Sequence, residues 1–126
     1  MKLLFPLLLL TAALAQAAPT AAPHPGEKVY REVCQACHMA NAKGAVGAGR
    51  IASLAANPNL SYPEYPITIV TGGKGAMPWF RGDLSDQDIA DVIGYVRTHF
   101  GNNYKAKVTV ADVAKYGVKA PERGER

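Results

Sequence analysis

The chain has 126 residues and a formal net charge of +4 at pH 7, from 14 lysines and arginines against 10 aspartates and glutamates. A chain of this length forms one domain with a small apolar core. Its basic residues are scattered along the sequence, so the charge pattern excludes a nucleic-acid-binding protein. Its 2 cysteines are too few for the disulfide framework of a small secreted domain.

Residues 1–17 have the layout of a secretory signal peptide. Lys2 gives a positive start, residues 3–14 are apolar, and Ala15-Gln16-Ala17 matches a small-x-small cleavage site. The apolar run is shorter than the roughly 20 residues that span a bilayer. We therefore predict cleavage after about Ala17, export to the periplasm and no stable membrane insertion, with a retained N-terminal anchor as the alternative.

The next two segments differ sharply in composition. Residues 18–25 are rich in alanine and proline and predict a flexible leader. Residues 26–37 predict a helix, because their apolar side chains recur at helical spacing on one stripe. The stripe consists of Val29, Tyr30, Val33 and Cys37.

The predicted helix runs into the pentapeptide Cys34-Gln35-Ala36-Cys37-His38, which has the pattern C-x-x-C-H. This pattern is typical of a c-type haem attachment site. There the two thiols, Cys34 and Cys37, form thioether bonds to the porphyrin vinyl groups. His38 then becomes an axial ligand of the iron. The pattern predicts one covalently held haem c.

Three other uses of a C-x-x-C pattern remain open on the pentapeptide alone. A thioredoxin-like redox pair requires a strand before it, and no strand pattern precedes Cys34. A zinc site requires four ligands, and beyond the pentapeptide the chain offers only His24 and His99 as further histidines. A structural disulfide between Cys34 and Cys37 is the third alternative.

Two weaker segments follow the pentapeptide. Residues 41–59 are dominated by alanine and glycine and predict a long loop that closes against a bound ligand. Residues 62–72 are ambiguous, because their β-branched residues favour a strand while Pro66 suits the first turn of a helix. Gly72-Gly73 suits a helix end, so we predict a short helix here.

The segment Gly72 to Phe80 is the best candidate for a second axial ligand. Met77 offers a thioether sulfur, and Met/His ligation raises the reduction potential of a haem. The neighbouring glycines allow the backbone to approach the ring closely, and Pro78 restricts Met77 to extended conformations. Trp79 and Phe80 can cover the ring and exclude water.

Three other residues are weaker candidates for this ligand. Met39 follows His38 directly, and so short a tether cannot reach the opposite face of the ring. His99 lies near the end of a predicted helix, where a histidine is favourable without any ligand role. His24 belongs to the leader.

The clearest helix pattern covers residues 85–100. Ser85 is a good N-cap, the first turn is acidic, and apolar residues follow at helical spacing up to Phe100. Gly101-Asn102 predicts its end. A last short helix is predicted from Thr109, with Asp112 in a capping-box arrangement.

Taken together, these features resemble the class I cytochromes c. The residues that carry the resemblance are Gly26, Tyr30, Cys34, Cys37, His38, Gly73, Gly75, Met77, Pro78, Leu84, Ser85 and Tyr95. The resemblance implies an all-α fold in which the N- and C-terminal helices cross near Gly26, Tyr30 and Tyr95, with the haem in a cleft. It also implies a cytochrome c domain over residues 26–104 and a C-terminal extension over residues 105–126.

Two departures from the family pattern bear on the haem pocket. Many members have glycine after the haem histidine, where this chain has Met39. Many also have a proline whose carbonyl accepts a hydrogen bond from the haem histidine, whereas the corresponding residues 50–54 contain no proline. The sequence therefore leaves open which carbonyl orients His38.

Residues 77–115 are more narrowly similar to cytochrome subunits of membrane-bound alcohol dehydrogenases. This resemblance implies a periplasmic electron carrier, not itself an enzyme, that passes single electrons from a dehydrogenase, including the quinoprotein type, to a cytochrome oxidase or another redox protein. A haem peroxidase or ligand sensor with a displaceable sixth ligand is one alternative. A fixed subunit of a dehydrogenase or oxidase complex is the other.

Overall fold

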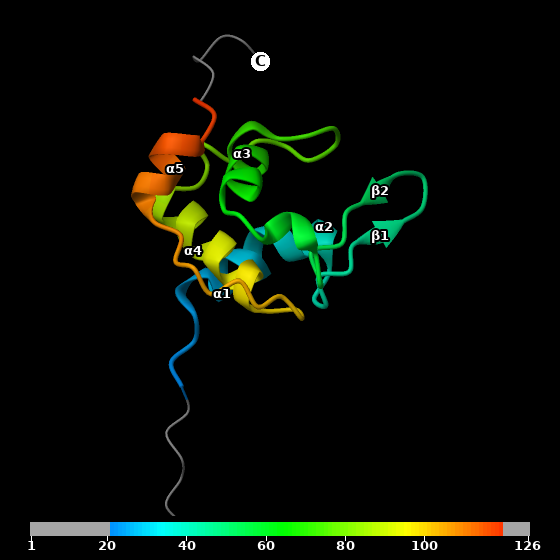
Figure 1. The fold of residues 1–126 in the computed structure, drawn as a ribbon. Helices are drawn as coiled ribbons and strands as arrows, with labels where there is room; N and C mark the ends of the chain where they lie inside the picture. Colours follow the sequence, from blue (N-terminus) through cyan, green and yellow to red (C-terminus); the bar gives the residue numbers. More distant parts are fainter. Residues whose placement is uncertain (1–20, 120–126) are drawn as a thin grey trace, which may run out of the picture.

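The computed structural model describes residues 21–119, so the predicted signal peptide, residues 1–17, lies outside the described part (Figure 1). The elements in chain order are α1 (Pro25–Val29), the π-helical η1 (Tyr30–Cys34), α2 (Gln35–His38), β1 (Ala45–Val46), β2 (Arg50–Ile51), the 3-10 helix η2 (Pro58–Leu60), α3 (Glu64–Gly72), α4 (Asp86–Thr98) and α5 (Val110–Tyr116). None of the helices within the described range is long and apolar enough to cross a bilayer.

The predicted first helix forms as one continuous helical stretch made of α1, η1 and α2. The middle segment is a π-helix, in which the Gln35 N–H donates to the Tyr30 carbonyl five residues earlier. A π-turn contains more residues than an α-turn, so it rotates the side chains that follow it. Cys37 is exposed, although the helical pattern placed it on the apolar stripe.

The N-terminal helix crosses α4, and the contact is too close for any residue other than glycine at position 26. A Cβ atom on Gly26 would overlap the carbonyl of Asp91 on α4. The Tyr30 and Tyr95 rings pack beside this crossing with their centroids 5.7 Å apart. Tyr30 is 1% exposed and Tyr95 is 9% exposed, so this aromatic pair belongs to the core.

The prediction of a purely all-α fold is wrong in one respect, because residues 45–51 form a short antiparallel hairpin. Ala45 pairs with Ile51 and Val46 pairs with Arg50, within the segment expected to be an irregular loop. The Gly47 N–H donates to the Gly49 carbonyl at 2.9 Å and closes the turn. Glycines at a turn favour a hairpin. The sequence did not predict it, because alanine and glycine dominate the segment and give no alternating apolar pattern.

The two central helices end where the backbone leaves the helical conformation. The ambiguous segment is helical, as predicted, and α3 ends at Gly72, before Gly73 with φ +72°. α4 begins after Ser85, whose hydroxyl and Asp88 form a capping box. It ends at Thr98, two residues before the predicted end, because His99 is extended, with φ −122° and ψ 178°.

The C-terminal helix α5 packs against α3 and α4 (Figure 1). It begins with the predicted capping box between Thr109 and Asp112. Its residue Val113 is fully buried. Arg97 of α4 is 1% exposed and donates to the carbonyls of Leu60, Ser61 and Ala106. A buried guanidinium stabilises the fold only where its donors are satisfied, so Arg97 fixes the segment that leads into α5.

Candidate haem site

The two cysteines of the pentapeptide lie one helical turn apart at the junction of η1 and α2, and both are free thiols. Cys34 is partly buried and Cys37 is exposed. Burial, and then the proximity of Cys37, raises the pKa of the Cys34 thiol to about 11. A thioredoxin-like pair depends on a lowered thiol pKa, so this environment argues against thiol redox chemistry.

His38 is the last residue of α2 and is 8% exposed. Its Nδ1 lies 2.9 Å from the carbonyl oxygen of Ala52. A carbonyl can only accept, so Nδ1 carries the proton and Nε2 keeps its lone pair. The Ala52 carbonyl therefore supplies the orientation that the sequence left unassigned, and Nε2 is free to bind a metal.

The loop that carries Ala52 is fixed to the end of α2 by backbone hydrogen bonds. The N–H of Leu54 donates to the Ala42 carbonyl at 2.7 Å, and the N–H of Gly44 donates to the His38 carbonyl at 3.1 Å. A Cβ on Gly44 would lie 2.7 Å from the Ala52 carbonyl oxygen, and Gly44 has φ +66°. Gly44 thus permits the close approach that places Ala52 beside His38. In the sequence, the only sign of this role was that position 44 is a glycine.

Met39 adopts a backbone conformation that normally requires glycine, with φ +67° and ψ 164°. Such a conformation costs a non-glycine residue about 1–3 kcal/mol. The buried Tyr30 hydroxyl donates to the Met39 carbonyl at 2.7 Å and holds this turn. The turn explains why glycine is common here in the class I cytochromes c, and it leaves the Met39 side chain 40% exposed.

Met77, Pro78 and Trp79 line a cavity of about 530 Å³ between the end of α3 and the start of α4. The other lining residues are Gly72, Gly73, Lys74, Gly75 and Asp83. Phe80, predicted to cover the same ligand, is partly buried but does not line this cavity. Lys74 and Met77 exchange two backbone hydrogen bonds of 3.0 Å, which form the tight turn that carries Met77.

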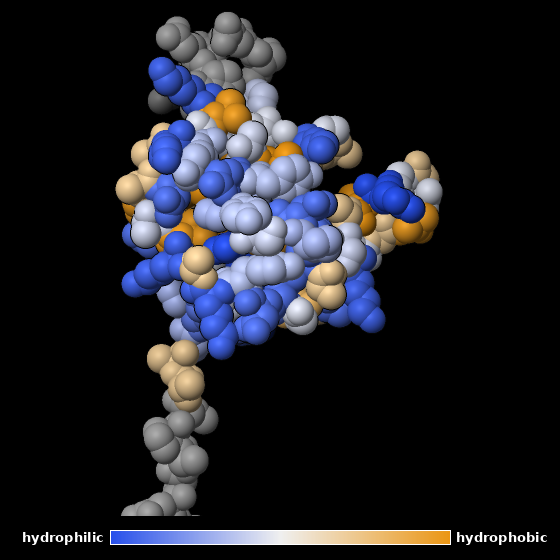
Figure 2. Space-filling model, viewed as in Figure 1, coloured by the Kyte–Doolittle hydropathy of each residue, from blue (hydrophilic) through white to orange (hydrophobic). Residues whose placement is uncertain are grey.

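The pentapeptide and the Met77 cavity come from different parts of the chain, and Cys34, Cys37 and His38 do not line the cavity. Figure 1 shows the loop after α3 and the β1–β2 hairpin extending on the same side of the molecule. Figure 2 shows a notch in the surface between them, with hydrophobic residues at its border.

The donor set of this region fits haem c. It comprises two thiols one turn apart, a buried imidazole with Nε2 free, and a thioether on the wall of a cavity. Imidazole and thioether are the axial ligands of low-spin electron-transfer haems. Within residues 21–119 no three histidine, cysteine or acidic side chains group together, so the described residues assemble no zinc site.

The two histidines outside the pentapeptide belong to the helix crossing. His24, expected in a flexible leader, caps α1 by accepting from the Gly26 N–H at 3.1 Å. Its ring lies 5.6 Å from that of Tyr95, whose ring lies 4.1 Å from that of His99. Burial, followed by the charge of His99, lowers the pKa of His24. Neither histidine lines the Met77 cavity.

Comparison with known proteins gives one matching family. The sequence profile described as "Cytochrome C oxidase, cbb3-type, subunit III" matches residues 21–96. Cytochrome c6 of Leptolyngbya boryana is 40% identical over 72 residues, which cover 56% of this chain and 85% of that protein.

Two further relatives are subunits of larger assemblies. The "Alcohol dehydrogenase (quinone), cytochrome c subunit" of Gluconacetobacter polyoxogenes is 35% identical over 105 residues, covering 72% of this chain. The "Gluconate 2-dehydrogenase cytochrome c subunit" of Pantoea cypripedii is 34% identical over 103 residues. The chain spans only 22% and 23% of these two relatives.

Proposed function

This chain belongs to the cytochrome c family, as its match to the cbb3-type subunit III profile and its similarity to cytochrome c6 show. We propose that it is a periplasmic mono-haem electron-transfer protein. It carries one haem c, attached through thioether bonds to Cys34 and Cys37. His38 and Met77 would bind its iron, and Pro78, Trp79 and Phe80 would pack against the haem. The haem supplies an iron that cycles between the ferric and ferrous states.

The observation that carries this proposal is the hydrogen bond from His38 Nδ1 to the Ala52 carbonyl, at 2.9 Å. It fixes the tautomer and the ring orientation, and it increases the basicity of Nε2 as a ligand. The imidazole is already buried and held by two chain segments, so little rearrangement accompanies a change of charge at the ligand. Small rearrangement is what rapid electron transfer requires.

The Met77 side gives the protein its means of tuning the potential. A thioether ligand favours the reduced state relative to a second imidazole, and Gly73, Pro78 and Trp79 line the cavity beside Met77. The two ligands together leave no open coordination position. This arrangement distinguishes a carrier from a peroxidase or a ligand sensor, which needs an open or displaceable sixth position.

Spectroscopy of the oxidised and reduced protein tests the ligand assignment. We expect a weak sulfur-to-iron absorption band in the oxidised protein and slow, weak binding of carbon monoxide to the reduced protein. Rapid carbon monoxide binding without a sulfur band would instead support the peroxidase or sensor alternative. Detection of haem on a denaturing gel tests the covalent attachment separately.

The proposed electron donor is a periplasmic dehydrogenase, including the quinoprotein type, and the proposed acceptor is a cytochrome oxidase or another redox protein. The similarity to cytochrome subunits of alcohol and gluconate dehydrogenases supports the donor class. Contacts with both partners are transient, over a small face beside the haem edge. Lys43 and Lys74 are exposed and can steer acidic partners to this face.

Two measurements test the partner assignment. Stopped flow can follow reduction of the oxidised protein by a purified quinoprotein alcohol dehydrogenase. The reaction should be second order, and its rate constant should decrease as the salt concentration rises. A rate that does not depend on salt, in the wild type and in the Lys43→Glu, Lys74→Glu variant, would exclude steering by these lysines. Gel filtration distinguishes a free carrier from the fixed subunit, since a fixed subunit elutes with its complex.

A further inference from the structure

We propose that the C-terminal segment after α5 holds the Met77 loop in its ligating conformation, through two hydrogen bonds made by Val118. This inference rests on the proposed role of Met77 as an axial ligand. The loop comprises residues 72–80, between Thr71 at the end of α3 and Arg81. We call the hydrogen bonds from Val118 to Thr71 and from Arg81 to Val118 the Val118 bridge.

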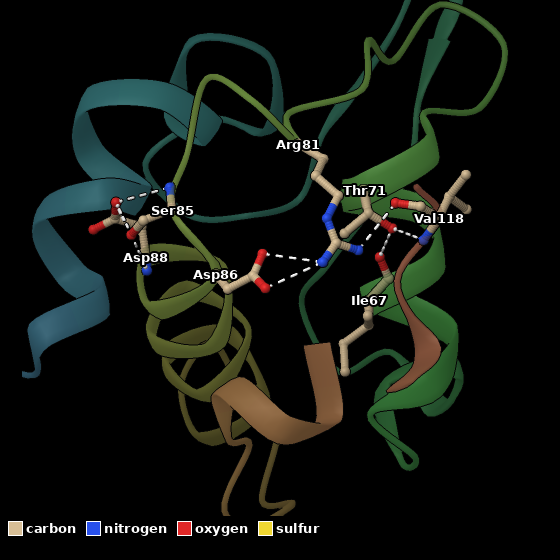
Figure 3. A network of polar contacts seen from close by, with 7 residues as sticks. All are labelled: Ile67, Thr71, Arg81, Ser85, Asp86, Asp88 and Val118. Carbon is tan, nitrogen blue, oxygen red and sulfur yellow. Dashed lines mark hydrogen bonds and ion pairs between the residues drawn. The ribbon is translucent and has the colours of Figure 1, made fainter. Parts of the chain in front are cut away.

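The Val118 bridge connects both ends of the Met77 loop to one residue (Figure 3). The Val118 N–H donates to Thr71 Oγ1 at 2.8 Å. Its carbonyl accepts from Arg81 Nη1 at 3.0 Å. One residue of the C-terminal segment, through its N–H and its carbonyl, is therefore hydrogen-bonded to both ends of the loop.

Thr71 is positioned to accept that hydrogen bond. Its side chain is 1% exposed, and its hydroxyl donates to the Ile67 carbonyl at 2.7 Å. A threonine hydroxyl has one proton, so a hydroxyl that donates to Ile67 presents its lone pairs to Val118. A buried acceptor that loses its donor is destabilising, so this hydrogen bond favours the conformation in which Val118 contacts Thr71.

Arg81 is held from two directions. Its Nη2 donates to both carboxylate oxygens of Asp86, at 3.1 and 3.2 Å, and its Nη1 donates to Val118. The Arg81 side chain is 19% exposed and that of Asp86 is 33% exposed. Charge-assisted hydrogen bonds with limited exposure are stronger than those between surface groups. Arg81 thus joins the first turn of α4 to the C-terminal segment.

The close packing at Gly72 supports the same assignment. A Cβ on Gly72 would lie 2.8 Å from Val118 Cγ2, so the Val118 side chain occupies the space that glycine leaves. A second cavity, of about 210 Å³, is lined by Thr71, Gly72, Trp79, Val118 and Lys119. Val118 therefore lies directly behind the wall that Trp79 and Gly72 form on the Met77 cavity.

The loop holds its own conformation only in part: Lys74 and Met77 exchange two backbone hydrogen bonds, and the Phe80 N–H donates to the Val70 carbonyl at 2.9 Å. It contains three glycines, at positions 72, 73 and 75, and Gly73 and Gly75 have positive φ values of +72° and +57°. Glycine loses more conformational freedom on ordering than any other residue. Fixing the ends of such a loop reduces the number of conformations in which Met77 lies away from the iron. The Val118 bridge makes Thr71 and Arg81 positioning residues for Met77.

Imidazole affinity of the oxidised holoprotein tests this proposal, because imidazole competes with Met77 for the iron. The apparent dissociation constant for imidazole is inversely proportional to the fraction of molecules whose sixth position is open. Removal of the Arg81 donors by Arg81→Ala should lower it by about tenfold, and Thr71→Val by about threefold, with a matching loss of the sulfur-to-iron band. Val118→Pro removes the N–H donor, keeps the carbonyl that accepts from Arg81, and should resemble Thr71→Val.

Matched controls separate the bridge from general destabilisation. Thr98 makes the same hydroxyl bond within a helix, to the Gly94 carbonyl at 2.9 Å, so Thr98→Val should leave imidazole binding unchanged. Arg31 forms an exposed ion pair with Glu27 at 3.9 Å, so Arg31→Ala serves as the control for Arg81→Ala. Holoprotein yield and circular dichroism establish that each variant is folded.

The outcomes distinguish the two levels of the proposal. A wild-type protein without a sulfur-to-iron band would overturn the ligand role of Met77 itself. A wild type with this band, and Thr71→Val and Val118→Pro variants whose imidazole affinity stays within twofold of it, would overturn the Val118 bridge alone. If Arg81→Ala gives no folded holoprotein, those two variants still decide the result.

Discussion

The His38 side and the Met77 side of the site are held in different ways. His38 ends a helical stretch that crosses α4, and its ring is bonded to a carbonyl only 14 residues away. Met77 lies in a glycine-rich loop whose ends are bonded to Val118, 37 and 47 residues away from Arg81 and Thr71. A ligand held by local, buried structure stays bound, whereas a ligand on a loop depends on the segment that holds the loop.

The largest effect should come from the two cysteines. Replacing both by alanine, in a Cys34→Ala, Cys37→Ala variant, removes the only groups that can form thioether bonds within the pentapeptide. We expect complete loss of haem detected on a denaturing gel and of the corresponding mass of the purified protein. Retention of covalent haem in this variant would contradict the attachment site.

Met77→Ala should affect the potential but not the attachment. We expect loss of the sulfur-to-iron band and a decrease in reduction potential that is a substantial fraction of the ~0.8 V range set by axial ligands. Met39→Ala is the matched control, since Met39 is 40% exposed and its carbonyl, not its sulfur, makes the contact with Tyr30. The ligand assignment would be wrong if Met39→Ala, and not Met77→Ala, abolished the band.

Gly26→Ala tests whether the helix crossing supports the His38 side. The added Cβ would overlap the Asp91 carbonyl on α4. Overpacking of this kind lowers the free energy of unfolding by about 1–3 kcal/mol. Denaturant unfolding measures this change, and Gly47→Ala is the control because a Cβ on Gly47 would meet no atom within 4 Å. Equal stability of the two variants would show that α1 and α4 do not need this close approach.

The smallest effect concerns the pH dependence of the helix crossing. Burial and then His99 lower the pKa of His24 below 6.5, while Asp91 and Glu27 act in the opposite direction. The unfolded chain then binds a proton at a higher pH than the folded protein does. The free energy of unfolding should therefore decrease as the pH falls below about 6.5, and protonated Nδ1 can no longer cap α1.

The variant His24→Asn isolates this contribution, because asparagine keeps a capping acceptor and does not titrate. Denaturant midpoints measured at about pH 7 and about pH 5 should differ less in His24→Asn than in the wild type. The same difference in both proteins would assign the pH dependence to another group.

Helix starts and the short α3 were predictable because they depend on neighbours in the sequence. Ser85 and Thr109 cap helices through residues three positions later, so their capping boxes can be recognised from the sequence. The end of α4 was predicted to within two residues. The hairpin at residues 45–51 was not predicted, because it depends on turn geometry that no apolar pattern records.

The sequence by itself determined the chemistry of this protein: two thiols and an imidazole in C-x-x-C-H spacing, and a thioether framed by glycines and a proline. These features are local, because covalent spacing and backbone restriction act between neighbours. Only the tertiary structure decided that Ala52 orients His38, that a π-turn interrupts the first helix, and that Val118 joins Thr71 to Arg81. Each of these involves backbone N–H or C=O groups, which nearly every residue carries. The identity of the side chains therefore does not predict which backbone group takes part.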